Sequence, residues 1–310
     1  MVPPLSIVFA GSPAAAVPSL RALSRSEHSV ELVLTREDSP QGRRGVLSPT
    51  PVALEATELG LPVLRANRLA GAATDEVIRV APDLGVIVAY GGLVREPLLS
   101  APRLGWINLH FSILPRWRGA APVQRAIMAG DDLTGASVFQ LVPELDAGNV
   151  FGTLTQPIGA LETAGHLLDS LANSGAELLV RVVGALADGT ARAEPQQGDV
   201  TIAPKLTLED GRIDWSADAA SVSNLVRGVT PEPGAFTLLD GARLKVLSAA
   251  IARERVRLAP GAFELDGRRL LVGTATDPLE LLEVQPAGKK AMSATAWWRG
   301  RPADAARVAQ

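Results

Sequence analysis

The chain has 310 residues, of which 47% are hydrophobic and 20% charged, a composition typical of a globular protein with a sizeable buried core. Its net charge of −3 argues against a protein that grips nucleic acid mainly through bulk positive charge. The absence of cysteine excludes disulfides, thiolate nucleophiles and cysteine-based zinc sites.

Metal and membrane association are not expected either. The three histidines, His28, His110 and His166, are far apart and lie in no metal-ligand pattern, so we expect no metal. No apolar run is long enough to cross a membrane, and the first residues lack the basic and apolar regions of a secretory signal. We therefore expect a cytoplasmic protein.

Strands alternate with helices through the first 190 residues. The expected strands are residues 5–10, 30–35, 62–64, 84–90, 106–110, 136–142 and 150–155. The expected helices are residues 14–24, 52–59, 74–81, 96–100, 123–129 and 163–187, and residues 37–51 are expected to form a long loop. This alternation predicts an α/β fold with an open, mostly parallel, Rossmann-like sheet and helices on both faces.

The character of the chain changes after this region. Residues 190–205 are polar and lack periodicity, so we interpret them as a linker between a domain at 1–189 and a second domain at 206–310. In the second domain one helix at 217–227 precedes short strands at 235–239, 244–249, 268–272 and 279–284. Asp240-Gly241 and Asp266-Gly267 mark turns between them. These features predict a small β-barrel or sandwich.

Two polar residues share one face of the strand expected at 106–110. Asn108 and His110 are two residues apart, so they point to the same side of the strand, away from Ile107 and Leu109. A carboxamide donor beside an imidazole suits a reaction in which a carbonyl becomes an oxyanion while a proton moves. A purely structural histidine is the alternative.

Asp146 is the third candidate at this site. It follows the strand expected at 136–142, so we expect its loop to lie at the same edge of the sheet as His110. A carboxylate at that position would orient the imidazole and raise the fraction of imidazolium. An ordinary turn aspartate is the alternative.

Several motifs along the chain resemble the formyltransferases that use 10-formyltetrahydrofolate, and most closely those that formylate the methionyl amine of initiator tRNA. The motifs are HFSILP at 110–115, RGAAP at 118–122, GD at 130–131, TG at 134–135, LDAG at 145–148, VAYG at 88–91, IDW at 213–215 and QPAGKKAMS at 285–293. The resemblance covers nearly the whole chain, and the motifs together are highly specific.

The resemblance implies roles for the matching residues. Asn108, His110 and Asp146 match the family's catalytic trio, in which Asn and protonated His donate to the oxyanion and Asp holds the His. The matching folate-binding residues are Ser112, Ile113, Leu114, Pro115, Val88, Ala89, Tyr90 and Gly91. Arg43 and Arg44 match a loop that reaches the tRNA acceptor end, and the second domain resembles an OB-like module that contacts tRNA.

The expected enzyme is therefore a monomer that takes a formyl group from 10-formyltetrahydrofolate and transfers it to initiator methionyl-tRNA, giving formylmethionyl-tRNA for translation initiation. The principal alternative is a sugar-nucleotide N-formyltransferase, which shares the trio and the folate chemistry. A glycinamide ribonucleotide formyltransferase normally ends near the linker. An RNA-binding module on an inactive scaffold would not need the intact Asn108, His110 and Asp146.

Overall fold

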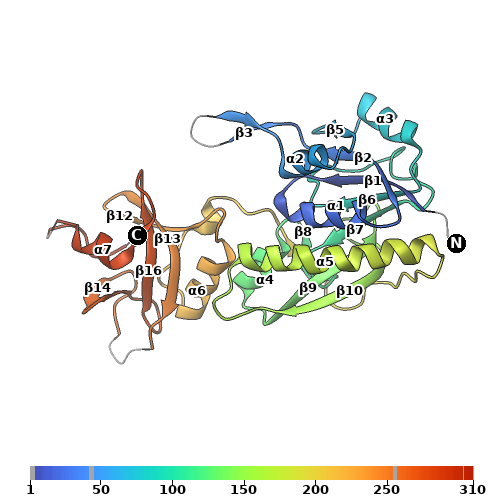
Figure 1. The fold of residues 1–310 in the computed structure, drawn as a ribbon. Coiled ribbons are helices and arrows are strands. Elements are labelled where there is room, and N and C mark those ends of the chain that lie inside the picture. The colour runs from blue at the N-terminus through green and yellow to red at the C-terminus, as the bar shows by residue number, and fades with distance from the viewer. Residues whose placement is uncertain (1–3, 42–44, 254–256, 303, 310) are drawn as a thin grey trace. The chain divides into compact units, whose positions relative to one another are not determined.

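The computed structural model describes residues 4–41, 45–253, 257–302 and 304–309 (Figure 1). The chain divides into two compact units. The first unit contains Met1–Pro122, Thr134–Gln156 and Leu168–Ala203, and the second contains Val123–Leu133, Pro157–Leu167 and Pro204–Gln310. Within the described residues, no helix is both long and apolar enough to cross a membrane.

A seven-stranded sheet forms the centre of the first unit, in the order β10-β9-β7-β6-β1-β2-β5. Its strands are β1 (Ser6–Gly11), β2 (Ser29–Thr35), β5 (Val63–Arg65), β6 (Leu84–Val88), β7 (Trp106–His110), β9 (Leu133–Gln140) and β10 (Val150–Pro157). The five strands from β5 to β7 run parallel, whereas β9 pairs antiparallel with β7. The predicted mostly parallel sheet is confirmed.

Helices cover both faces of this sheet. They are α1 (Val17–Ser24), α2 (Pro51–Glu58), α3 (Ala72–Val80) and α5 (Ala164–Ala187), with a short 3-10 turn η1 (Ala14–Ala16) before α1. Val77 of α3 belongs to the same buried cluster as Val8 and Trp106. Leu109 points to the opposite face and packs against α5 at Gly175. A Cβ atom on Gly175 would lie only 3.1 Å from Cδ2 of Leu109, so the absence of a side chain there makes room for the leucine. The two faces of β7 are thus both buried, as strands of a parallel sheet usually are.

Two local expectations for the first unit were wrong. Residues 96–100 form a turn rather than a helix, and the Leu98 carbonyl accepts a hydrogen bond from Trp106 Nε1 at 2.8 Å. A stretch of five residues that contains Pro97 is too short to sustain a helix by itself. The loop expected at 37–51 contains a hairpin of β3 (Ser39–Gln41) and β4 (Val46–Ser48), whose three-residue strands are too short to show periodicity.

The second unit is built on an antiparallel sheet in the order β12-β13-β16-β15-β14, with β17 paired to β16. Its elements are α4 (Pro122–Ala129), η2 (Glu209–Gly211), α6 (Ala219–Gly228), β12 (Ala235–Leu239), β13 (Ala242–Ile251), β14 (Phe263–Asp266), β15 (Arg269–Val272), β16 (Leu279–Pro286), β17 (Met292–Ser293) and α7 (Ala294–Arg299). This small, barrel-like sheet agrees with the prediction for the second domain.

Turns and aromatic packing shape this sheet. Asp240 and Gly241 have φ values of 52° and 70°, as a type I′ turn requires, and they join β12 to β13 as predicted. Trp297 and Trp298 of α7 pack against the core, and the Trp298 ring stacks on Phe263 with centroids 5.1 Å apart. These tryptophans therefore serve packing.

The segment interpreted as a linker is bound to the first unit. β11 (Ile202–Ala203) pairs in parallel with β8 (Arg118–Gly119), and Glu194 exchanges backbone hydrogen bonds with Val150. Because hydrogen bonds rather than a row of apolar side chains hold this segment, its sequence has no periodicity that would reveal the attachment.

Candidate active site

The carboxyl ends of three neighbouring strands define one edge of the sheet. β1 pairs with β6 and β6 pairs with β7, all in parallel. Residues 89–91 leave β6 at this edge, and residues 111–115 leave β7 beside them. Open α/β sheets bind their ligands at this edge. The two segments expected to bind folate therefore start from adjacent strands.

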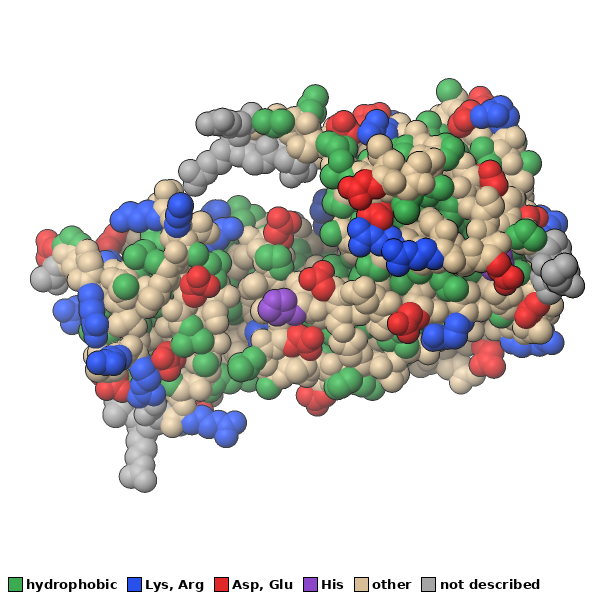
Figure 2. Space-filling view, viewed as in Figure 1, with side chains coloured by type: hydrophobic (Ala, Val, Ile, Leu, Met, Phe, Trp, Pro, Cys, Tyr) green, Lys and Arg blue, Asp and Glu red, His purple; other side chains and the backbone are tan. Residues whose placement is uncertain are grey.

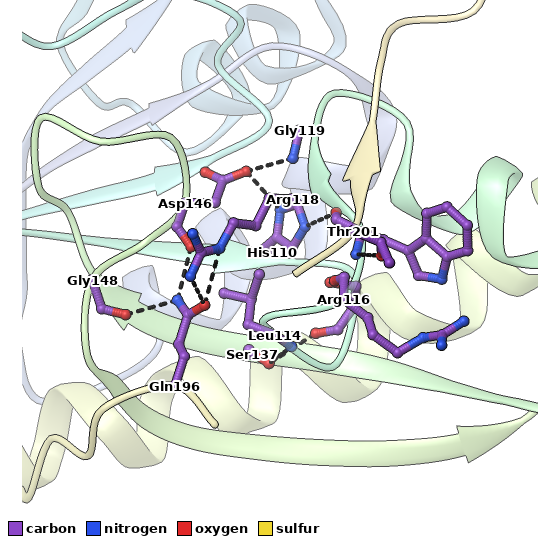
Figure 3. A network of polar contacts seen from close by, with 12 residues as sticks. His110, Leu114, Arg116, Arg118, Gly119, Ser137, Asp146, Gly148, Gln196 and Thr201 are labelled. Atoms are coloured by element: carbon purple, nitrogen blue, oxygen red, sulfur yellow. Dashed lines mark hydrogen bonds and ion pairs between the residues drawn. The ribbon is translucent and has the colours of Figure 1, made fainter. Parts of the chain in front are cut away.

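His110, the last residue of β7, is buried and held at both ring nitrogens. Its Nε2 lies 2.8 Å from the Trp117 carbonyl, and its Nδ1 lies 3.7 Å from Oδ2 of Asp146 (Figure 3). Since a carbonyl oxygen only accepts hydrogen bonds, Nε2 carries a proton. Nδ1 is thus the nitrogen that gains or loses a proton, and it does so beside a carboxylate.

Asp146 reaches His110 by a different route from the one expected. β9 runs antiparallel to β7, with His110 opposite Ser137, so β9 ends beside the start of β7 and not at the carboxyl edge. The loop after β9 folds back to bring Asp146 to His110. There its Oδ2 accepts a 2.7 Å hydrogen bond from the Gly119 amide. The contact was predicted, but the reason given for it was wrong.

Burial sets the protonation of His110. Loss of solvent lowers the pKa of its imidazole, while the nearby Asp146 carboxylate and the Trp117 carbonyl act in the opposite direction without overcoming it. The pKa of His110 therefore lies below its ordinary value of 6.5. At neutral pH the imidazole is uncharged, whereas the sequence led us to expect an imidazolium.

Asn108 lies on the same face of β7 as His110 and is only partly buried. Its carboxamide has no hydrogen-bond partner among the described side chains and backbone groups, so its two N–H donors are available to a ligand. Such a donor stabilises an oxygen that gains negative charge next to His110.

The segment after β7 is held by Ser137, which was not among the residues predicted for the site. Ser137 Oγ donates to the Ser112 carbonyl at 2.8 Å and accepts from the Leu114 amide at 3.3 Å. Ser112 Oγ in turn donates to the Arg116 carbonyl at 2.6 Å. Four residues of this segment, Ser112, Ile113, Leu114 and Pro115, are therefore held in a fixed turn. A polar residue within the buried strand β9 was the available signal for Ser137.

The segment after β6 is tied to the turn that follows β1. Ser12 Oγ donates to the Tyr90 carbonyl at 3.1 Å, and Arg36 donates to the Gly91 carbonyl at 2.8 Å. The Tyr90 ring is buried and its hydroxyl donates to the Ala66 carbonyl at 2.7 Å. Ala89, with φ of 48°, and Gly91, with φ of 79°, flank the anchored Tyr90 in the chain, and both are exposed.

Four further residues support the site: Trp117, Arg118, Gln196 and Thr201. Thr201 Oγ1 accepts from the Trp117 amide at 2.8 Å, next to the carbonyl that binds His110 (Figure 3). Arg118 and Gln196 hydrogen-bond to each other and, through Gln196, to the Asp146 loop. Gln196 and Thr201 lie in the aperiodic segment, so no sequence pattern marks them.

The remaining predicted residues are Arg43 and Arg44, which lie outside the described residues. Over the described residues visible in Figure 2, basic and acidic side chains are interspersed. Nor does the described part of the chain contain a cluster of three or more His, Asp and Glu side chains that could hold a metal ion.

The sheet thus carries a paired histidine and aspartate beside an open carboxamide, groups that can accept a proton and donate hydrogen bonds to an oxygen that gains negative charge. The model of the formyl transferase family matches residues 5–183, and that of the formyl transferase C-terminal domain matches residues 205–302. The chain belongs to the formyl transferase family, as its motifs predicted.

Named relatives match nearly the whole chain. The chain is 59% identical over 297 residues to the methionyl-tRNA formyltransferase of Clavibacter sepedonicus. The matched region covers 96% of this chain and 97% of that protein. It is 50% identical over 298 residues to the methionyl-tRNA formyltransferase of Thermobifida fusca, with 96% of each chain covered.

Solved structures of lower identity share the fold. An N-formyltransferase from Helicobacter canadensis, in complex with folinic acid and dTDP-3-aminofucose, superposes with a TM-score of 0.69 at 15% identity, over 92% of this chain and 100% of that one. HypX from Aquifex aeolicus in complex with tetrahydrofolic acid superposes with a TM-score of 0.63 at 19% identity, over 96% of this chain and 47% of that one.

Proposed function

We propose that this enzyme transfers the formyl group of 10-formyltetrahydrofolate to the methionyl amine of initiator tRNA, giving formylmethionyl-tRNA for translation initiation in the cytoplasm. Relatives that bear the name methionyl-tRNA formyltransferase match both units at 50–59% identity. The observation that carries the chemistry is the 3.7 Å contact between Asp146 and His110, which lies on the same strand as Asn108.

The site is suited to a folate donor on two grounds. Ala89 and Gly91 expose backbone next to Asn108's strand, and the turn of residues 112–115 is fixed by Ser137. When bound, the donor supplies the formyl carbon as the electrophile, and the nitrogen that carries it is the leaving group. We assign Val88, Ala89, Tyr90, Gly91 and the turn after β7 to donor binding.

Asn108 acts on the formyl oxygen. As the methionyl amine attacks the formyl carbon, this oxygen gains negative charge, and the free N–H donors of Asn108 stabilise it. Loss of one such donor costs roughly 3–4 kcal/mol of transition-state stabilisation in enzymes that use an oxyanion site. The partial exposure of Asn108 leaves its amide accessible to a substrate.

His110 handles the proton. The attacking amine must lose a proton, and the neutral imidazole accepts it at Nδ1, since Nε2 is already protonated. The imidazolium that forms is stabilised by the Asp146 carboxylate 3.7 Å away. It then returns the proton to the departing folate nitrogen. Asp146 thus orients His110 and makes its charged form accessible during the reaction.

The test is formyl transfer by the purified protein from 10-formyltetrahydrofolate to three acceptors: initiator methionyl-tRNA, elongator methionyl-tRNA and a dTDP-linked amino sugar. We expect rapid formylation of initiator methionyl-tRNA and at most slow formylation of the other two. Turnover of the amino sugar without turnover of methionyl-tRNA would overturn the proposal in favour of the sugar-nucleotide alternative.

The tRNA contacts of this proposal rest on the family resemblance. Arg43 and Arg44 are assigned to the acceptor end of the tRNA, because guanidinium groups bind phosphates through paired hydrogen bonds. The barrel-like second unit is assigned to the remainder of the tRNA.

A further inference from the structure

The side chain of Gln196 uses both of its polar atoms at the site. Its Nε2 donates to the carbonyls of Asp146 and Gly148, each at 2.8 Å. Its Oε1 accepts from Nε and Nη2 of Arg118 at 3.1 and 2.6 Å. All of these atoms lie in the first unit, and Figure 3 shows Gln196 between the Asp146 loop and Arg118. Among side chains, only a carboxamide can donate two hydrogen bonds through one atom and accept two through another.

These hydrogen bonds hold both ends of another one. The Gly119 amide donates to the Asp146 carboxylate at 2.7 Å. Gly119, the donor, directly follows Arg118, whose guanidinium is held by Gln196. Asp146, the acceptor, is held by Gln196 through its backbone carbonyl. Gln196 closes this ring of contacts.

The backbone that Gln196 holds is of a kind that needs support. Asp146 has φ of 46°, in the left-handed region that residues other than glycine adopt infrequently. Backbone in this region persists when surrounding contacts fix it, and it is common at functional sites. Two residues later, a Cβ on Gly148 would lie 1.7 Å from the Gln140 carbonyl, so the loop is closely packed there as well.

We infer that Gln196 is a positioning residue for the transfer reaction, which sets the place of the Asp146 carboxylate beside His110. This inference rests on the proposed function, in which Asp146 stabilises the imidazolium of His110. The segment that looks like a linker in the sequence thereby supplies part of the active-site architecture. Gln196 itself touches neither reacting group.

Three variants of the full-length protein test this role. Gln196→Met keeps the length of the side chain but removes every hydrogen bond. Gln196→Glu still accepts from Arg118 but cannot donate to the Asp146 and Gly148 carbonyls. Gln197→Ala is the matched control, because Gln197 is the exposed neighbour on the same segment. Each variant is assayed for kcat, for KM of donor and tRNA, and for thermal unfolding.

We expect kcat to fall roughly 10- to 100-fold in Gln196→Met and Gln196→Glu, since small displacements of a catalytic group have effects of this size. KM values should stay within about twofold, and Gln197→Ala should match the wild type. The His110 imidazole, followed by NMR in Gln196→Met, should titrate at lower pH than in the wild type, because the Asp146 carboxylate is held less well. A merely structural role would lower the unfolding temperature without moving this titration.

Asp146→Asn separates failure of the inference from failure of the proposed function. If Asp146→Asn lowers kcat and shifts the His110 titration but Gln196→Met does neither, the positioning role is refuted while the site stands. If Asp146→Asn changes neither kcat nor the His110 titration, the role proposed for the His110–Asp146 pair is itself refuted. A wild-type kcat in Gln196→Glu would also refute the role of the two donated hydrogen bonds.

Discussion

The Nδ1 atom of His110 faces the Oδ2 atom of Asp146 at 3.7 Å, while the opposite ring nitrogen is committed to the Trp117 carbonyl. This arrangement fixes the tautomer of the neutral imidazole and leaves one nitrogen for proton transfer. Burial lowers the pKa of His110 even though the carboxylate is close, so the resting pair is a neutral base beside an anion.

The pH dependence of kcat/KM should reveal this base. Because the pKa of His110 is below 6.5, the imidazole is neutral at pH 7 and becomes charged only when the pH falls through its lowered pKa. We therefore expect kcat/KM to decrease on the acidic side with an apparent pKa below 6.5. An increase in kcat/KM as the pH falls through this region would instead indicate that an imidazolium is required.

The same lowered pKa affects stability. Between the folded pKa of His110 and about 6.5, the unfolded chain binds more protons than the folded one, so the free energy of unfolding falls as the pH falls. Over this pH range, the free energy of unfolding should change less steeply with pH in His110→Gln than in the wild type. Urea unfolding at a series of pH values measures it, and identical slopes in the two proteins would contradict the assignment.

Asp146→Asn should reduce kcat roughly 10²- to 10⁴-fold, because the imidazolium formed during the reaction loses its counter-charge. The substitution removes an interaction that raises the pKa of His110, so that pKa should fall further. Imidazole NMR is well suited to the measurement, since the chain has only three histidines and His28→Gln and His166→Gln assign the signals. A raised pKa of His110 in this variant would contradict the account.

Ser137→Ala should weaken donor binding more than it slows the chemical step. The Ser137 hydroxyl holds the turn at residues 112–115, and its loss leaves the Leu114 amide without that partner. We expect the free energy of unfolding to fall by about 1–3 kcal/mol and KM for the folate donor to rise.

Ser19→Ala is the matched control for this variant. Both serines are fully buried in the first unit, but the Ser19 hydroxyl has no hydrogen-bond partner within the described residues. Its removal should be neutral or slightly stabilising. Equal destabilisation by the two substitutions would contradict the role given to Ser137.

Arg43→Ala tests the proposed tRNA loop. A guanidinium that binds a phosphate contributes about 1.5–3 kcal/mol, so KM for methionyl-tRNA should rise roughly 10-fold or more while KM for the folate donor stays nearly unchanged. Arg79→Ala, at an exposed arginine paired with Glu76 on α3, should change neither value. Equal increases in both KM values for Arg43→Ala would indicate an effect on folding instead.

The sequence predicted the part of the site that follows from local periodicity. Strand alternation placed Asn108 and His110 on one face of β7, and the order of strands and helices predicted the sheet that carries them. The contact with Asp146 was predicted through a rule for parallel strands, but β9 is antiparallel, and strand direction is not encoded in the apolar pattern of a single strand.

The supporting residues were beyond sequence reasoning. Gln196 acts through four hydrogen bonds to residues about 50 and 80 positions away, none of which leaves a local pattern. The short strands β8 and β11, with two residues each, are defined only by their pairing. Such contacts depend on tertiary structure that periodicity does not report.

In the proposed mechanism Asn108 stabilises the formyl oxygen, while His110 and Asp146 move the proton. The most direct measurement is the single-turnover rate of formyl transfer to initiator methionyl-tRNA in Asn108→Ala, with donor affinity determined separately. We expect a rate at least roughly 100-fold below that of the wild type, with donor binding nearly unchanged. A near-normal rate in Asn108→Ala would contradict this mechanism.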